Sequence, residues 1–138
     1  MNKRAGAIPY YRENGKIYML FFIPSDAAFG GTKYQISKGH LDEGETTTEA
    51  AVREAEEELG LKKSNIKTIK LGSIDEIEGM SKSYELYTYL IEVNNKNDFG
   101  PTTFETKETK WLTFEEFQKV GRGSHLGIVK SVYRNILK

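Results

Sequence analysis

Three carboxylates spaced for a single helix face are the most chemically informative residues of this sequence. Glu54 lies in the run REAEEE, and Glu57 and Glu58 follow it by three and four positions. In a helix these side chains share one face, and each like-charge pair at this spacing costs an isolated helix about 0.2–0.5 kcal/mol. A divalent cation reverses that cost, because Mg²⁺ uses hard oxygen ligands when it also holds a phosphate group. A solvated acidic face is the alternative interpretation.

The residues around the acids mark the limits of the helix that must position them. Thr46 and Glu49 fit a capping box, in which each side chain bonds a free backbone N–H. Gly60 suits the left-handed position after the last turn, so the pattern predicts a helix over residues 46–59. A narrow stripe of small apolar side chains lets this helix lie close to a sheet while the acids point elsewhere. The stripe consists of Ala51, Ala55 and Leu59.

The segment before this helix, residues 37–45, is interpreted as a loop. Gly39 and Gly44 permit backbone conformations that are closed to other residues. Such a loop can bring a carbonyl or an N–H group beside a metal ion or a phosphate.

The remaining pattern predicts strands around two further helices. Residues 3–11 and 16–23 read as a hairpin with its turn at Glu13 to Lys16, and a short strand is expected at 34–37. Residues 66–78 and 84–93 are expected to pair. A last strand at 107–112 precedes a short helix capped by Thr113, and a final helix is expected over 124–137. Mixed strands with two main helices indicate an α+β or α/β sandwich.

Residues 39–61 together resemble the signature of the Nudix hydrolases. That signature is Gly, five residues, Glu, seven residues, Arg-Glu, an apolar residue, any residue, Glu-Glu, any residue, Gly and an apolar residue. Every fixed position is matched, by Gly39, Glu45, Arg53, Glu54, Ala55, Glu57, Glu58, Gly60 and Leu61. The resemblance implies one Nudix domain over residues 1–138, with an α+β fold in which a mixed, partly parallel sheet lies between helices as an α/β/α sandwich.

The resemblance also implies roles for individual residues. Glu54, Glu57 and Glu58 become the ligands of Mg²⁺ or Mn²⁺, joined by the backbone carbonyl of Lys38. In relatives a further acid lies a few residues before a Trp that starts a short helix. Trp111 is that landmark here, so the candidates are Glu105 first and Glu108 second. Glu54 is a reasonable general base, with Glu58 and Glu105 as alternatives. Structural roles are implied for Gly39, Gly60 and the pair Glu45 and Arg53.

Residues 34–40, YQISKGH, resemble the aromatic-x-x-Pro-Lys-Gly-His segment of the diadenosine tetraphosphate hydrolase branch. Ser37 stands at the usual Pro position and Tyr34 at the usual Trp position. The candidate substrate-binding residues are Arg4, Tyr34, Lys38, His40, Lys82 and Tyr87. Tyr84 is a second stacking candidate, but strand alternation puts it on the opposite face from Tyr87. The alternative interpretation of Lys38 is a solvated lysine, and that of His40 is a loop-packing residue. Phe29 is interpreted as a lid or an anchor.

The reaction implied by the resemblance is Mg²⁺-dependent hydrolysis of a phosphoanhydride bond in a nucleoside diphosphate-linked substrate. A dinucleoside polyphosphate such as diadenosine tetraphosphate is the first choice. The alternatives are a nucleoside triphosphate, ADP-ribose, a capped or 5′-triphosphate RNA end, and an inositol pyrophosphate. A non-catalytic nucleotide-binding domain is the alternative from another class, although no signature acid is missing. Replacing Glu57 by Gln is predicted to reduce turnover strongly while leaving the fold intact.

Composition limits the partners. The 138 residues contain 20 Lys and Arg against 20 Asp and Glu, so no global field favours nucleic acid or an anionic membrane. Cysteine is absent, which excludes disulfides and thiolate zinc sites. The sequence shows no signal peptide and no apolar run long enough to span a bilayer, so a cytoplasmic location and a small nucleotide partner are expected. Oligomeric state stays open.

Overall fold

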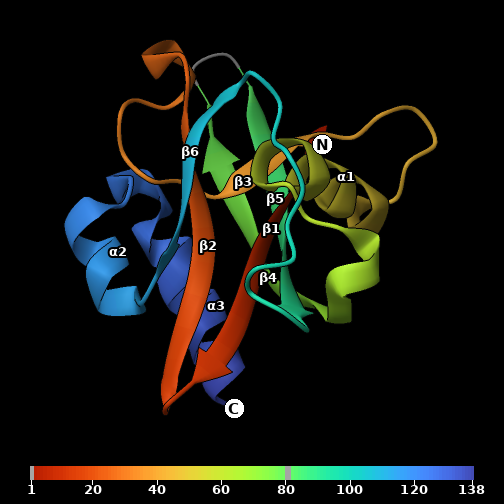
Figure 1. The fold of residues 1–138 in the computed structure, drawn as a ribbon. Coiled ribbons are helices and arrows are strands. Elements are labelled where there is room, and N and C mark those ends of the chain that lie inside the picture. Colours follow the sequence, from red (N-terminus) through yellow and green to blue (C-terminus); the bar gives the residue numbers. More distant parts are fainter. Residues whose placement is uncertain (1, 80–81) are drawn as a thin grey trace.

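The computed structural model describes residues 2–79 and 82–138, and within them six strands form one mixed sheet (Figure 1). The order is β4-β5-β1-β2-β6, and β3 also pairs with β1. β1 runs parallel to β5, while every other pairing is antiparallel. The strands are β1 (Asn2–Glu13), β2 (Lys16–Pro24), β3 (Ser37–His40), β4 (Ile66–Glu78), β5 (Ser83–Val93) and β6 (Thr106–Leu112).

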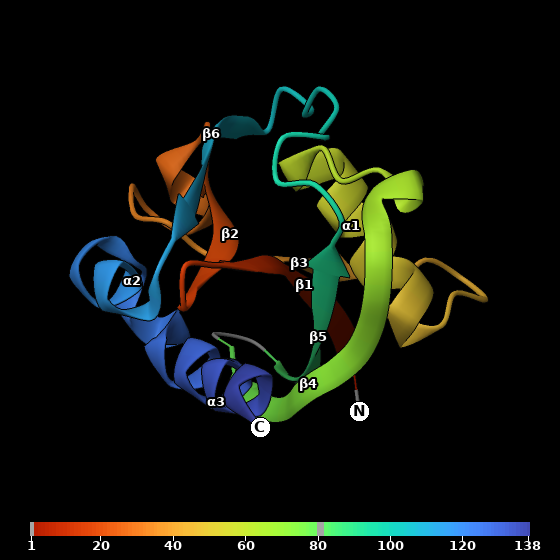
Figure 2. The same ribbon diagram turned by 60° about the horizontal axis from the view of Figure 1, so that its bottom comes forward.

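Helices lie on both sides of this sheet (Figure 2). α1 (Thr47–Leu59) packs on one face, and α2 (Phe114–Val120) and α3 (Leu126–Leu137) pack on the other. Short 3₁₀ turns precede or follow these elements: η1 (Ala27–Phe29), η2 (Lys63–Asn65) and η3 (Gly123–His125). The predicted α+β arrangement, a mixed sheet between helices, is confirmed. No helix in the described ranges has the length and apolar character needed to cross a membrane.

Each face of the sheet has its own hydrophobic core. On the α3 side, large side chains such as Phe21, Leu90 and Val132 fill the space between sheet and helices. On the α1 side, the contact is made by small residues of both elements, which lets the helix backbone lie close to β1. These residues are Ala5, Ala7, Ala50, Ala51 and Ala55. α1 is therefore held at a fixed, short distance from the strands that flank its acidic face.

On the side of β1 that faces away from β5, the pairing partner changes from β3 to β2 along the strand. Residues Arg4 to Ala7 pair with β3, whereas Tyr10 to Glu13 pair with β2. Pro9 lies between these two paired segments, while its other side faces β5. A proline lacks the N–H that a central strand normally donates, and it is tolerated where no strand accepts that bond. β2 and β3 therefore diverge at Pro9, and β3 turns toward α1.

Three boundaries differ from the sequence expectation. Residues 37–40 form β3 rather than a loop, because they pair with β1 at a point where Gly6 leaves room for them. A Cβ at Gly6 would lie 2.9 Å from the carbonyl oxygen of Ser37. In the expected strand 34–37, Tyr34 and Gln35 make single bridges only. The final helix begins at Leu126, after the turn η3. The hairpin, the helix after Thr46 and the pairing of β4 with β5 are confirmed.

Candidate active site

α1 is fixed at both ends by the residues that the sequence singled out. The Thr46 side chain accepts from the N–H of Glu49, and the Glu49 carboxylate accepts from the N–H of Thr46. Gly60 ends the helix in the left-handed conformation, with φ of 75°. A side chain at that position would be strained and would also meet the carbonyl of Gly100. Because both ends of α1 are fixed, the backbone positions of its glutamates are fixed as well.

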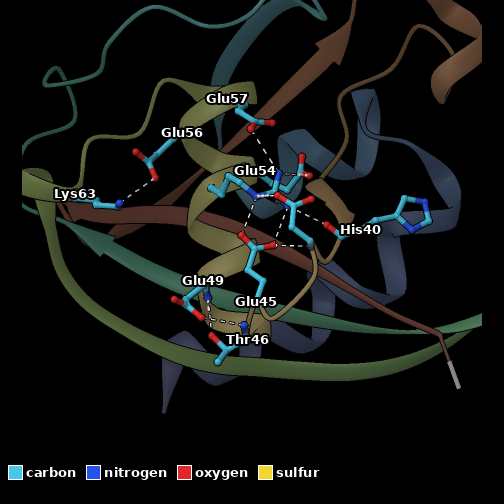
Figure 3. Close-up of polar contacts among 10 residues, drawn as sticks. His40, Glu45, Thr46, Glu49, Glu54, Glu56, Glu57 and Lys63 are labelled. Carbon is cyan, nitrogen blue, oxygen red and sulfur yellow. Dashed lines mark hydrogen bonds and ion pairs between the residues drawn. The ribbon is translucent and has the colours of Figure 1, made fainter.

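Arg53 joins α1 to the turn before it. Its guanidinium donates to both oxygens of Glu45, at 2.8 and 3.0 Å, and to the carbonyl of His40 at 2.9 Å. The same group donates to Glu54 at 3.1 Å and to Glu57 at 3.4 Å, and these acids gather beside α1 in Figure 3. The hydrogen bond from Arg53 holds the pKa of Glu45 below its usual value. Arg53 therefore connects β3, the following turn and two acids of α1.

Glu58 is the most deeply placed acid of the helix. Its Oε1 accepts from the Ser37 hydroxyl at 2.8 Å and from the Lys38 N–H at 3.1 Å. Burial, together with the nearby charge of Glu54, raises the pKa of Glu58 to about 8 despite these hydrogen bonds. The serine at the position where the resembled branch has proline thus supplies a hydroxyl donor, and a proline there would supply none.

Glu54 lies against β3 at Gly39, where any larger residue would push its carboxylate away. An added Cβ at Gly39 would lie 2.1 Å from Oε1 of Glu54. Burial raises the pKa of Glu54, and the charges of Glu57 and Glu105 raise it further. Glu54 is therefore in an environment that already contains other carboxylates.

Acidic and cationic side chains line one cavity of about 560 Å³. The acids are Glu54, Glu58 and Glu105, and the cations include Arg4, Lys38 and Arg122. Glu57 is not among the lining residues: its side chain is 47% exposed and bonds Arg53 at the rim. A cavity with this lining can hold a polyphosphate together with a cation.

A second cavity, of about 700 Å³, continues from the first on the side of β4 and β5. It shares Arg4, Lys38, His40 and Arg122 with the first cavity and adds Lys82 and Tyr84. The guanidinium carbon of Arg4 lies 4.1 Å from the centre of the Tyr84 ring. The Nε of Arg4 is buried without a hydrogen-bond partner in the described structure. Charge and an aromatic surface thus lie together here.

Two predicted substrate residues lie elsewhere. Tyr87 packs with the cluster on the α1 face, beneath the Lys3 ammonium, so Tyr84 rather than Tyr87 lines the cavity. The Tyr34 hydroxyl donates to Glu108 at 2.6 Å, and burial and this carboxylate raise the pKa of Tyr34 to about 12. Glu108, the second candidate for the further acid, is thereby engaged by Tyr34, whereas Glu105 reaches the acidic cavity.

Several cavity residues were not anticipated from the sequence. Arg122 lines both cavities and donates to Gln35 at 3.2 Å, and Ser124 and His125 line the larger one. They follow α2, far from the signature, and no local pattern distinguishes them. The bridge between Tyr34 and Gly121 brings that segment beside the residues that precede β3, together with the hydrogen bond from the N–H of Arg122 to the carbonyl of Tyr34 at 2.7 Å.

The donor set suits a hard divalent cation, although the acids do not converge on one point. Within residues 2–79 and 82–138, no three His, Cys, Asp or Glu side chains are arranged as a ready metal site. Arg53 engages one oxygen of Glu54, and Ser37 engages one oxygen of Glu58, which leaves the second oxygen of each for a ligand role. Clustered carboxylates of raised pKa gain from a cation, and oxygen donors are those that Mg²⁺ and Mn²⁺ accept.

Comparisons with known proteins agree with this geometry. The profile described as NUDIX domain matches residues 1–131. The chain is 28% identical over 127 residues to the asymmetrical bis(5′-nucleosyl)-tetraphosphatase of Caenorhabditis elegans, covering 91% of this chain and 88% of that protein. The crystal structure of a C. elegans Ap4A hydrolase binary complex is similar with a TM-score of 0.82 and 27% identity, over 99% of this chain and 98% of that one. A Nudix hydrolase from M. smegmatis, RenU, shares the fold with a TM-score of 0.73 and 18% identity, over 98% and 88%.

Proposed function

The chain belongs to the Nudix family and is a Nudix hydrolase, and from this premise we propose that its substrate is a dinucleoside polyphosphate, diadenosine tetraphosphate above all. We propose that Mg²⁺ or Mn²⁺ assists hydrolysis of one phosphoanhydride bond. The similarity to the C. elegans enzyme supports this substrate class. The observation on which the proposal depends is the single cavity lined by both acids and cations.

The acids are proposed to hold the cation. Glu54, Glu58 and Glu105 line the cavity, and Glu57 lies at its rim. Lys38, whose N–H donates to Glu58, is proposed to add its carbonyl oxygen to this set. When bound, the cation supplies neutralisation of phosphate charge and activation of water. Glu54 is our choice of general base, because it lines the cavity and Arg53 orients it through a 3.1 Å hydrogen bond.

The cations are proposed to bind the phosphates. Arg4, Lys38 and Arg122 line both cavities, so their charges follow the path of an extended chain of phosphates. His40 and Lys82 extend this lining in the larger cavity. At the far end, Tyr84 replaces Tyr87 as the aromatic surface for an adenine ring. This arrangement suits a substrate longer than one nucleoside triphosphate.

A hydrolysis assay tests the proposal. Purified protein would be given diadenosine tetraphosphate, nucleoside triphosphates, ADP-ribose and 5′-triphosphate RNA, with Mg²⁺, with Mn²⁺ and with a chelator. We expect the dinucleotide to give the highest kcat/KM, with products AMP and ATP, and no turnover with the chelator. Preference for another member of the panel would overturn the substrate class while leaving the family unchanged.

Replacing Glu57 by Gln tests the cation-binding role of the helix. We expect turnover to fall roughly 100-fold, the order seen when one charge-stabilising group is removed, with an unchanged melting temperature. Glu56→Gln is the matched control, because Glu56 lies on the same helix and pairs with Lys63 away from the cavity. Full activity of Glu57→Gln would exclude Glu57 from the ligand set.

A further inference from the structure

Two exposed phenylalanines lie at the rim of a third cavity, beside the acids. Phe29 ends η1 and is 73% exposed, and Phe104 precedes β6 and is 90% exposed. Both line a cavity of about 310 Å³ that also includes Glu58 and Glu105. Single exposed apolar residues are ordinary on a surface. Two aromatic rings on one cavity that opens onto the acidic site form a surface suited to a planar ligand.

The backbone that bears these rings is tied to the acidic site. The N–H of Ser25 donates to the carbonyl of Glu105 at 2.8 Å, which joins the two loops. The N–H of Thr103 donates to the carbonyl of Glu57 at 2.9 Å, and the side chain of Gln35 donates to the carbonyl of Phe29 at 3.2 Å. The loop after β2 and the start of β6 also lie side by side in Figure 1. The main chain that bears both rings therefore has a fixed position relative to the helix acids.

We propose that Phe29 and Phe104 bind the second nucleobase of a dinucleoside polyphosphate. This inference rests on the proposed function and extends it. The three cavities are continuous through shared residues, so Tyr84 lies at one end, the cations and acids in the middle, and the phenylalanines at the other end. A molecule with two aromatic ends and a charged centre matches that order. Every base has a face that stacks on an aromatic ring, so the site tolerates different bases.

Substrates with one and two nucleosides test this assignment. Diadenosine tetraphosphate and adenosine 5′-tetraphosphate have equal numbers of phosphates, but only the first has a second base. For Phe104→Ala and Phe29→Ala we expect kcat/KM to fall roughly ten-fold for the dinucleotide and to stay nearly constant for the mononucleotide. Leu137→Ala, which removes an exposed apolar side chain on α3, is the control and should change neither. Equal losses on both substrates, or no loss, would overturn the assignment.

Calorimetric binding separates this inference from the proposed function. A methylene-bridged diadenosine tetraphosphate analogue is titrated with Mg²⁺ into wild type and into each Phe variant, beside the mononucleoside analogue. We expect a roughly ten-fold weaker Kd for the dinucleotide analogue alone. If wild type hydrolyses neither substrate, the proposed activity fails, and the binding comparison still decides on the phenylalanines. Unchanged dinucleotide affinity in both variants refutes the nucleobase site.

A different observation concerns the free edge of the sheet. β4 is a terminal strand, lying between α1 and the end of α3 in Figure 2. Three of its apolar side chains, Ile69, Leu71 and Ile74, are exposed on the α1 face. They share that face because the register shifts between Leu71 and Ser73. A long edge strand with an apolar stripe is a template for pairing with another strand.

The charges of β4 favour one kind of partner. Basic residues Lys67 and Lys70 lie in its first half, and acidic residues Asp75, Glu76 and Glu78 in its second half. An identical strand laid parallel places like charges together, whereas an antiparallel copy places opposite charges together. We infer that β4 pairs with β4 of a second copy in a two-fold dimer. Setting Leu71 opposite Ile74 of the second copy also sets Lys70 opposite Asp75, both on the α3 face.

Charge exchange tests this pairing. Sedimentation velocity over a wide concentration range should show a monomer–dimer equilibrium for wild type. We expect Lys70→Glu alone and Asp75→Lys alone to weaken the dimer roughly ten-fold or more, because each creates two repulsive contacts. A mixture of the two single variants should dimerise like wild type, because both contacts are then attractive. Lys107→Glu on β6, at the opposite edge, is the control.

The mixture distinguishes strand pairing from a general charge effect. A wild type that stays monomeric at every concentration refutes the dimer. Dimers that both single variants retain, or that the mixture fails to restore, refute this register. Lys70 also donates to the carbonyl of Asn135 at 3.4 Å, and Asp75 accepts from the Ser73 hydroxyl at 2.8 Å. Melting temperatures measured where all variants are monomeric separate the loss of these contacts from the loss of the dimer.

Discussion

His125 is a buried residue whose neutral form belongs to the native state. Its Nδ1 accepts the N–H of Ile36 at 3.1 Å, which fixes the backbone just before β3. Burial, followed by the charges of Arg122 and Lys38, lowers the pKa of His125 to about 3. Protonation would remove the acceptor and place a charge beside two cations. The position of the backbone at Ile36 therefore depends on an uncharged His125 imidazole.

This dependence predicts an acid-sensitive stability. The unfolded chain protonates His125 near pH 6.5, whereas the folded chain resists until about pH 3. The contribution of neutral His125 to the free energy of unfolding is therefore fully present above pH 6.5 and is lost as the pH falls toward 3. Below about pH 6, we expect the free energy of unfolding of wild type to fall about 1.4 kcal/mol more per pH unit than that of His125→Gln. Urea titrations of wild type and His125→Gln over this pH range measure it. Parallel curves for wild type and His125→Gln would contradict it.

Gly39 offers a second prediction at the residue scale. A methyl group there would lie 2.1 Å from Oε1 of Glu54, so Gly39→Ala must displace that carboxylate. Displacing a catalytic group by about 1 Å can cost roughly 100-fold in rate, and we expect kcat to fall by that order. Gly127→Ala is the control, because nothing lies within 4 Å of its added Cβ. Wild-type kcat in Gly39→Ala would show that the position of Glu54 is not critical.

At this scale the sequence identified the acids but not all of their contacts. Spacing predicts that Glu54 and Glu58 share a helix face, because a helix fixes the relation between neighbours three and four residues apart. Their role as ligands is implied by the resemblance and stays a prediction. The contact of Ser37 with Glu58 and the place of Arg122 in the cavities depend on strand pairing across long sequence separations. Tyr84 lines the cavity and Tyr87 does not. The sequence shows that these two residues lie on opposite faces of β5, but it does not show which face borders the cavity.

At the scale of elements, α1 depends on its capping box. Thr46→Ala removes the side-chain oxygen that bonds the N–H of Glu49. We expect a loss of about 1 kcal/mol in the free energy of unfolding, measured by urea denaturation. Thr102→Ala, at an exposed position before β6, is the control and should cost less than half as much. Equal losses of unfolding free energy in both variants would mean that the capping hydrogen bond does not stabilise α1.

Elements with a local signal were predictable, and those built from distant pairing were not. The hairpin of β1 and β2 and the ends of α1 follow from turn and cap residues. β3 was mistaken for a loop because four residues that include a glycine have no periodicity of their own. Its conformation is imposed by β1, which supplies the backbone partners. The parallel pairing of β1 with β5 likewise has no signature in either strand.

At the scale of the molecule, the two cores hold the sheet between helices. Leu90 is fully buried on the α3 face. We expect Leu90→Ala to cost about 2–5 kcal/mol in the free energy of unfolding, through lost burial and the cavity left behind. Leu137→Ala, which removes an exposed leucine, should cost well under 1 kcal/mol. Chemical denaturation of both variants measures the difference, and a small loss in Leu90→Ala would mean that the core relaxes around the gap.

The change of neighbour at Pro9 separates two tasks along β1. The half of β1 beyond Pro9 is locked into the hairpin with β2, while the half before it supports β3 and the residues beside the acids. Substitutions in β3 can therefore reshape ligand preference without loosening the hairpin. A designer could therefore vary Lys38 and His40 while keeping Gly39, where a side chain would displace the Glu54 carboxylate, and the rest of the scaffold.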